Sequence, residues 1–294
     1  MSPTCSPAGV RCDDAKNAAE PLALEPGPNS PDNPATACDE DLVQPTERAA
    51  RPDNLSCIKG EPTVEQLGTL AEASQRLETA SPAEIIAWAV KHFHPKLGMA
   101  TAFGPEGCVI LHMLSTIERG VYVFNLDTGY QFRETLELRD RIAERYGIEA
   151  VLRRPELSVE EYESKHGGPL YETDPNQCCF DRKIKVLREA ALGLDAWMSG
   201  IRRDQSSHRA KTPIVGWDKK FALVKISPLA NWTKKQVWDL IVKENVPYNP
   251  LHDQGYTSIG CQPCTRAIMF GEDERAGRWS GTGKTECGLH TIDE

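Results

Sequence analysis

The chain has 294 residues, enough for one large domain or two small ones, and its 39% hydrophobic content is ordinary for a globular core. Its 34 basic and 43 acidic side chains give a formal net charge of -9, which argues against a nucleic-acid-binding surface over the whole molecule but allows a local basic pocket for a small anion. No apolar run approaches the ~20 residues of a membrane-spanning helix, and the start of the chain lacks the apolar stretch of a secretory signal. We therefore expect a cytoplasmic protein with neither a membrane nor a nucleic acid as partner.

Residues 1–60 are expected to form a disordered tail. Ten of the 21 prolines fall within the first 62 residues and no aromatic residue precedes Trp88, so this stretch has little with which to build a core. It carries 5 basic and 10 acidic side chains, a net charge of -5, which is typical of solvated chain. We expect order to begin near Ser81, one α/β domain over residues 61–264, and a C-terminal arm over residues 265–294.

Helices and strands are expected to alternate from residue 81 to about residue 246. Ser81, Pro82 and Glu84 have the pattern of a capping box that begins a helix reaching about Phe93. Apolar runs predict strands at 97–103, 121–126, 148–154, 196–200 and 221–226, and amphipathic or capped segments predict helices at 108–119, 131–146, 158–166, 180–192 and 233–246. Short links between them indicate an α/β fold, with a mostly parallel sheet and helices on both faces. The glycine-rich chain near the C-terminus is expected to be a mobile arm.

Ten cysteines are many for a protein in a reducing compartment, so metal ligation or catalysis is favoured over disulfides. Four of them form two pairs, Cys178-Cys179 and Cys261-x-x-Cys264, about 80 residues apart, which only a folded domain can bring together. Adjacent cysteines are unusual for tetrahedral zinc, whereas the ligands of an iron-sulfur cube lie on different iron atoms. Spacing alone leaves both metals open.

Three motifs together resemble the assimilatory adenylyl-sulfate reductases, the iron-sulfur type within the phosphoadenylyl-sulfate reductase family. They are C-C-F-D-R-K from Cys178, C-Q-P-C from Cys261, and E-C-G-L-H around Cys287. The resemblance covers residues 81–290 and includes T-A-F-G-P-E-G, L-D-T-G and G-I-R-R-D-Q-S after successive strands. It implies a fold similar to the adenine-nucleotide alpha hydrolases and a 4Fe-4S cluster on Cys178, Cys179, Cys261 and Cys264.

The resemblance also implies the nucleophile. Cys287 would be the catalytic thiol, with His290 beside it, and a cysteine on a glycine-rich arm has the exposure that a nucleophile needs. Glu286 would raise the pKa of this thiol, so nearby cations must oppose it. His290 and His252 are candidates for proton relay.

The substrate site is expected where open parallel sheets bind ligands, at the carboxyl ends of the strands. The turn after the first strand supplies Thr101, Gly104 and Glu106, although it departs from the serine-rich loop of the hydrolases. Leu126 matches the adenine contact of the family and is equally typical of a strand core. Arg209, Arg275 and Arg278 match family positions that clamp the phosphosulfate, and Arg202 and Arg203 belong to the same motif with less certain roles. Lys183 follows the cysteine pair by about one helical turn, so we expect it to face both the cysteines and the sulfate as a fourth cation of the clamp.

The reaction implied by the resemblance is attack of the Cys287 thiolate on the sulfur of adenylyl sulfate. AMP would leave, and an S-sulfocysteine would remain on the arm until a second thiol releases sulfite. The chain has no C-x-x-C on a thioredoxin-like unit, so a thioredoxin- or glutaredoxin-type reductant is the expected partner. Two alternatives stay open: reduction of the 3'-phosphorylated substrate, and a non-catalytic, zinc-stabilised nucleotide-binding module. The sequence does not fix the oligomeric state, and a homo-oligomer is compatible with it.

Overall fold

Six strands form one sheet in the order β3-β2-β1-β4-β6-β5 in the computed structural model, which describes Leu55, Ile58 and residues 60–289. Every neighbouring pair is parallel except β5 and β6, which are antiparallel. The expected α/β class is therefore confirmed. The strands are β1 (Leu97–Ala100), β2 (Tyr122–Leu126), β3 (Val151–Arg153), β4 (Ala196–Met198), β5 (Val215–Asp218) and β6 (Leu223–Ile226).

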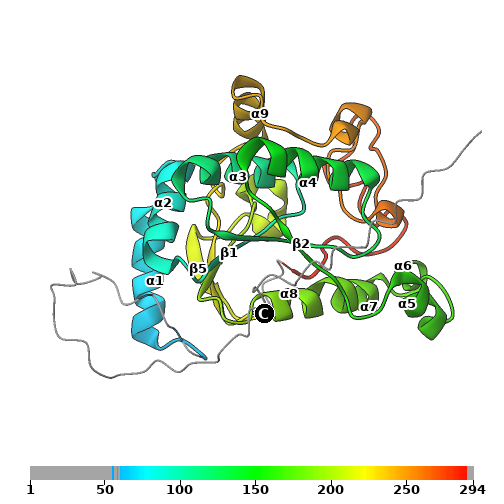
Figure 1. Cartoon of the computed structure of the whole chain (residues 1–294), viewed down its shortest axis with the longest axis horizontal. Coiled ribbons are helices and arrows are strands. Elements are labelled where there is room, and N and C mark those ends of the chain that lie inside the picture. The colour runs from blue at the N-terminus through cyan, green and yellow to red at the C-terminus, as the bar shows by residue number, and fades with distance from the viewer. Residues whose placement is uncertain (1–54, 56–57, 59, 290–294) are drawn as a thin grey trace, which may run out of the picture. The chain divides into compact units, whose positions relative to one another are not determined.

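Helices lie on both sides of this sheet. In Figure 1, α2, α3 and α4 run along one side, and α7 and α8 lie on the other. The helices are α1 (Val64–Arg76), α2 (Pro82–Phe93), α3 (Pro105–Ile117), α4 (Arg133–Tyr146), α5 (Val159–His166), α6 (Leu170–Thr173), α7 (Pro175–Cys179), α8 (Lys185–Ala190) and α9 (Lys234–Lys243).

Separate apolar cores fill the two sides because side chains alternate along each strand. Val123 and Met198 are buried in the larger core, which also contains residues of α2, α3 and α4. Their neighbours Phe124 and Trp197 belong to the second core, together with Leu187 of α8. Burial on both faces explains why the strands read as continuous apolar runs in the sequence.

Two predicted capping boxes are present. Ser81 and Glu84 begin α2, and Thr233 and Gln236 begin α9, each pair exchanging side-chain and backbone hydrogen bonds. Gly147 ends α4, which corresponds to the helix predicted at 131–146, and has a φ of 65°. The sequence predicts these helix ends because each one depends only on residues within one turn of the helix.

Order begins earlier than the predicted start near Ser81. Helix α1 precedes it, capped by Thr63, and Leu70 of α1 is buried in the larger core. Leu55, assigned from the sequence to the tail, is also buried there, at 1% exposure. The remainder of the tail, apart from Ile58 and residue 60, lies outside the described residues. Helix α1 was not predicted because it contains no aromatic residue and buries only Leu70 and Ala73 of its apolar side chains.

Two further differences concern the edge of the sheet and the first turn. Strand β5 was not predicted, since Val215–Asp218 is short and contains a glycine. The segment Gly104–Gly107, predicted as a turn, already belongs to α3, with Gly104 at the N-cap and Pro105 in the first turn.

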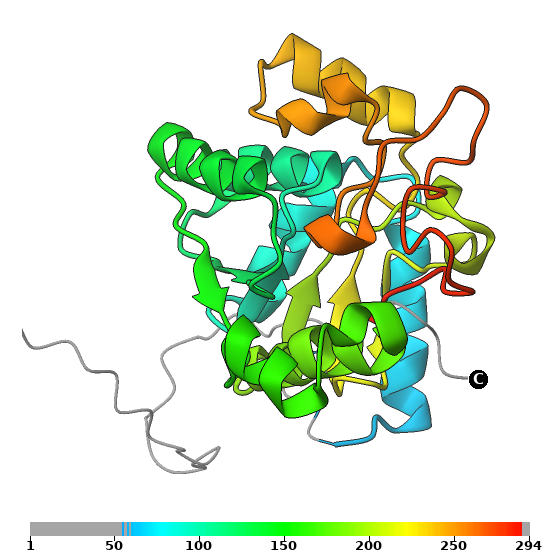
Figure 2. The same cartoon turned by 90° about the vertical axis from the view of Figure 1, so that its right-hand side faces the viewer.

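The chain after α9 is irregular, as predicted. It contains the short 3₁₀ segments η4 (Pro250–Gln254) and η5 (Gln262–Cys264). In Figure 2 the arrowheads of the strands point toward this orange and red segment, which therefore lies at the carboxyl ends of the sheet. Within the part of the chain that the structure describes, no helix is long and apolar enough to cross a membrane.

Candidate active site

A cavity of about 430 Å³, here called the main cavity, opens at the carboxyl ends of the central strands. Thr101, Leu126 and Ser199 line it from the segments that end β1, β2 and β4, and Gly104 and Glu106 line it from the start of α3. Strands β1 and β4 are neighbours in the middle of the sheet. After β1 the chain continues to β2 and β3 on one side, and after β4 it continues to β5 and β6 on the other side. The cavity therefore lies at the switch point where such sheets bind ligands, as the sequence predicted.

The turn between β1 and α3 is stabilised by the side chain of Thr101. The Oγ1 of Thr101 accepts a hydrogen bond of 3.0 Å from the N–H of Phe103, whose φ is 55°. A Cβ on Gly107 would lie 2.6 Å from that same Oγ1, so only glycine lets the first turn of α3 approach Thr101. The arrangement brings the amino end of α3, with its free N–H groups, to the cavity.

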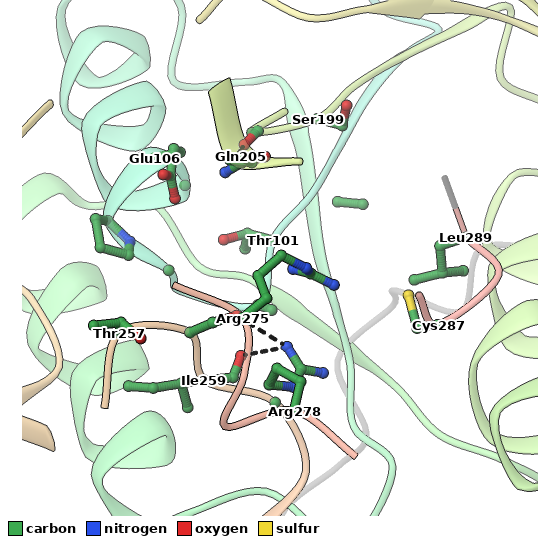
Figure 3. Close-up of a pocket in the computed structure, with 18 of the residues that line it drawn as sticks. Thr101, Glu106, Ser199, Gln205, Thr257, Ile259, Arg275, Arg278, Cys287 and Leu289 are labelled. Atoms are coloured by element: carbon green, nitrogen blue, oxygen red, sulfur yellow. Dashed lines mark hydrogen bonds between the residues drawn. The ribbon is translucent and has the colours of Figure 1, made fainter. Parts of the chain in front are cut away.

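Five cationic side chains line the main cavity, which gives it the charge of an anion site. They are Lys183, Arg209, Lys234, Arg275 and Arg278. Arg278 is held over the ring of Trp279, 4.4 Å from its centroid, and donates from Nη1 to Ser258 Oγ at 3.4 Å. Its Nε has no hydrogen-bond partner in the described part of the chain. In the view of Figure 3, Arg275 and Arg278 lie between Glu106 and Cys287.

Arg202 and Arg203 are not at this cavity. The side chain of Arg202 is fully buried and donates from Nε to Glu106 at 2.8 Å, with Asp204 and Glu274 beside it. Arg203 pairs with Glu78 and donates to the carbonyl oxygen of Thr212. The predicted substrate-binding role is therefore replaced by a structural one, because both guanidinium groups are occupied by protein carboxylates.

The two cysteine pairs meet in a second, much smaller pocket, here called the cysteine pocket. Cys178, Cys179, Cys261 and Cys264 line it together with Thr128 and Arg182. The loop after β2 docks on the Cys261 segment: the N–H of Gln262 donates to Tyr130 O at 2.7 Å, and Thr128 Oγ1 lies 3.3 Å from Cys261 Sγ. Among the described residues, no group of three or more His, Cys, Asp or Glu converges as on a single metal ion.

The four thiols interact strongly with one another. Burial, followed by the charges of Cys179, Cys261 and Cys264, raises the pKa of Cys178 to about 12, and burial with Cys261 raises that of Cys264 to about 11. Cys178 and Cys179 are buried, and Cys261 and Cys264 are half-buried. Four sulfurs that repel one another as thiolates form a donor set for a cationic centre. The donor set thus fits an iron-sulfur cluster.

Lys183 joins the two pockets, since it lines both of them. It lies on the π-helical turn η1 (Phe180–Ile184) that follows Cys179 without a break. Burial opposes its charge, but Cys261, Cys179 and Cys287 outweigh burial and raise the pKa of Lys183. The expectation that Lys183 faces both the cysteines and the ligand site agrees with this placement.

Cys287 lines the main cavity from the C-terminal arm. The arm, expected to be mobile, lies docked up to Leu289: Lys220 Nζ donates to Gly288 O at 2.8 Å and Lys284 Nζ to Asn176 Oδ1 at 2.7 Å. His290 lies outside the described residues. His252 lines the cavity, and burial lowers its pKa, so the ring favours the neutral form.

Residues 96–267 match the model of the phosphoadenosine phosphosulfate reductase domain. The chain belongs to this reductase family. Over 207 residues it is 47% identical to the adenosine 5'-phosphosulfate reductase of Bacillus pumilus, covering 70% of this chain and 89% of that protein. Over 237 residues it is 43% identical to the adenosine 5'-phosphosulfate reductase of Streptomyces coelicolor, covering 80% of this chain and 100% of that protein. The resemblance to adenylyl-sulfate reductases that the sequence motifs indicated is thereby confirmed.

A solved structure has the same fold. The phosphoadenylyl-sulfate reductase of Candida auris, crystallised as a phosphate complex, superposes with a TM-score of 0.62 and 32% identity, covering 71% of this chain and 98% of that chain. The agreement supports the doubly covered parallel sheet as the scaffold of this family member.

Several residues of the reductase site were missed from the sequence. Ser199 and Trp279 line the main cavity, are 2% and 3% exposed, and have side-chain polar atoms without a hydrogen-bond partner among the described residues. Arg182 is 3% exposed in the wall of the cysteine pocket, where its Nε donates to Thr128 O at 2.7 Å. Arg182 could have been predicted, because it precedes Lys183 in the motif C-C-F-D-R-K. No sequence pattern indicated Ser199.

Gly260→Ala is expected to weaken ligand binding without unfolding the protein. A Cβ at this position would lie 2.2 Å from Nη2 of Arg278, so the guanidinium group must leave its place beside the cavity. Loss of one contact to a charged group costs about 1.5–3 kcal/mol, so KM should rise roughly 10- to 100-fold with kcat less affected. Gly283→Ala is the control, because its methyl group would meet nothing within 4 Å. Equal KM values for the two variants would contradict a role of Arg278 in binding.

Proposed function

We propose that this protein reduces adenylyl sulfate to sulfite and AMP in assimilatory sulfate reduction. The observation that carries the proposal is that Cys287, five cations and the switch point of the sheet share one cavity, with the four-cysteine pocket joined to it through Lys183. The relatives named as adenosine 5'-phosphosulfate reductases support the same substrate.

The chemistry begins with the thiolate of Cys287. It attacks the sulfur of the sulfate group, an S–S bond forms as the S–O bond to the phosphate breaks, and AMP leaves with the bonding electron pair. Lys183, Arg209, Arg275 and Arg278 line the cavity and would stabilise the charge that develops on the bridging oxygen. The product on the protein is an S-sulfocysteine at Cys287.

Release of sulfite needs a second thiol. A thioredoxin- or glutaredoxin-type dithiol would attack the sulfur of Cys287, expel sulfite and then close its own disulfide, which returns Cys287 as a thiol. The need for such a reductant, and for thiols kept reduced, is the reason to place the protein in the cytoplasm.

A 4Fe-4S cluster is proposed as the cofactor of Cys178, Cys179, Cys261 and Cys264. The adjacent pair Cys178-Cys179 favours it over zinc, whose ligands are normally spaced further apart. Bound there, the cluster would tie the α7 segment to the Cys261 loop and set the electric field at Lys183. The protein's own part is to keep Lys183 charged between the thiolates and the main cavity.

The test of the substrate is turnover of the anaerobically purified enzyme with reduced thioredoxin and either adenylyl sulfate or its 3'-phosphorylated form. We expect kcat/KM to be higher for adenylyl sulfate by about two orders of magnitude, since a 3'-phosphate without a dedicated partner would be desolvated at a cost. Preference for the phosphorylated nucleotide would reverse the assignment. No sulfite from either nucleotide would favour the non-catalytic module.

A further inference from the structure

The fully buried guanidinium group of Arg202 is surrounded by carboxylates from three segments of the chain. They belong to Glu106 at the start of α3, Asp204 in the loop after β4, and Glu274 in the C-terminal arm. Nη2 of Arg202 lies 3.6 Å from Glu274 Oε1, and Nζ of Lys234, the first residue of α9, lies 3.8 Å from Glu274 Oε2. Two cations of the α/β domain therefore attract the side chain of Glu274.

The peptide group that joins Glu274 to Arg275 is held on both of its polar atoms. The carbonyl oxygen of Glu274 accepts a hydrogen bond of 2.6 Å from Thr257 Oγ1, and the N–H of Arg275 donates to Asp273 Oδ1 at 2.9 Å. A peptide group is planar, so these two bonds fix the plane from which the side chain of Arg275 departs. That side chain lines the main cavity, and in the view of Figure 3 it lies between Thr257 and Cys287.

The carboxylate of Glu274 is costly without its cations. Burial raises the pKa of Glu274, and the charges of Lys234 and Arg202 oppose that effect. A half-buried charge that loses a partner is strongly disfavoured, so the side chain keeps its place only while both cations are present. Because Arg202 follows β4 and Lys234 begins α9, the network fastens the segment of Arg275 to rigid parts of the fold.

We propose that Glu274 is a positioning residue, which through Arg202 and Lys234 fixes Arg275 at the place in the main cavity where the phosphate of the nucleotide binds. The inference rests on the proposed function, because it takes the ligand of Arg275 to be an adenylate. Glu274 also lines the cavity, but a carboxylate only accepts hydrogen bonds and cannot bind a phosphate dianion. Its contribution to phosphate binding therefore passes through Arg275.

The sign of the effect separates positioning from simple electrostatics. A carboxylate beside an anion site repels a phosphate, so a Glu274 that acted only through its charge would make Glu274→Gln bind AMP more tightly than the wild type. If Glu274 holds Arg275 in place, the same substitution weakens AMP binding. Adenosine has no phosphate, so its affinity reports on the rest of the cavity and should stay the same.

The experiment measures binding of AMP and of adenosine to the anaerobically purified protein by calorimetry. Glu137→Gln is the matched control, because it is the same substitution at an exposed carboxylate of α4 that pairs with Arg133. We expect Glu274→Gln to lose about 10-fold in AMP affinity, the lower end for a hydrogen bond to a charged group, and to keep its adenosine affinity. The control should match the wild type for both ligands. Equal or tighter AMP binding by Glu274→Gln, or an equal loss for AMP and adenosine, would overturn the proposal.

A double-mutant cycle tests whether the effect passes through Arg275. Arg275→Ala should weaken AMP binding, and adding Glu274→Gln to it should cause no further loss, because the side chain that Glu274 positions is already gone. Additive losses would contradict the positioning role. If Glu274→Gln folds poorly, Thr257→Val takes its place in the cycle, since it removes the hydrogen bond to the carbonyl oxygen of Glu274.

The same measurements separate this inference from the proposed function. A wild type that binds AMP no more tightly than adenosine would refute the phosphate contact of Arg275, and both would fall. If Arg275→Ala loses AMP affinity while Glu274→Gln keeps it, the positioning role is wrong and the proposed function stands.

Discussion

Cys287→Ser is expected to keep its iron and its affinity for adenylates while sulfite release falls by about 10⁴-fold or more, as for the loss of a covalent nucleophile. The reason is the separation of the two sites along the chain and in space. Cys287 lines the main cavity from the arm, whereas the four cysteines of the cysteine pocket are on α7 and the Cys261 loop. Binding and chemistry should therefore separate in this variant.

The matching experiment uses the wild type without a reductant. Mixing with adenylyl sulfate should release one AMP per active site and add one sulfonate group to the peptide that contains Cys287, and reduced thioredoxin should then discharge it as sulfite. Sulfonate on a different cysteine, or AMP release by Cys287→Ser at the wild-type rate, would contradict the assignment of the nucleophile. Stable binding of AMP to Cys287→Ser is the control that its cavity is intact.

Local patterns predicted the scaffold because the interactions that form it are local. The cap of α2 at Ser81 and the buried run of β2 can each be read within a few residues, and both are present. Placement of Lys183 followed from the same logic, since one turn after Cys179 is enough to carry it into both pockets. Helix α1 was missed because its burial depends on a surface offered by distant parts of the chain, including β5.

The roles of the arginines could not be predicted from local sequence patterns. Arg202 and Arg209 lie only seven residues apart, yet Arg202 is paired with Glu106 while Arg209 is paired with Glu286 at the cavity. Each partner is far away in the sequence, and only the fold decides which guanidinium group faces the ligand. The sequence recognised Glu286 as a neighbour of the thiol, and the structure adds that two cations already neutralise it.

The four-cysteine pocket gives the other large expected effect, which is loss of the proposed cluster in Cys261→Ser. Burial alone would raise the pKa of Cys261, but the charge of Lys183 and the hydrogen bond with Thr128 outweigh it and lower that pKa. Cys261 therefore becomes a thiolate ligand more readily than Cys178 or Cys264, whose pKa values are raised. A serine hydroxyl does not ionise in this range and is a poor ligand for iron, and no other cysteine of the described residues lines the pocket.

We expect Cys261→Ser to contain little or no iron and inorganic sulfide, to lack the broad visible absorption of the wild type, and to lose more than about 100-fold in activity. Cys108→Ala is the control: Cys108 is buried within α3 and lines neither pocket, so its loss should leave the iron content unchanged. If the wild-type protein is colourless and holds one zinc, the four cysteines form a structural zinc site and the proposed cluster is wrong. Full iron content in Cys261→Ser would remove this cysteine from the ligand set, and with it the argument that Lys183 joins the cluster site to the substrate site.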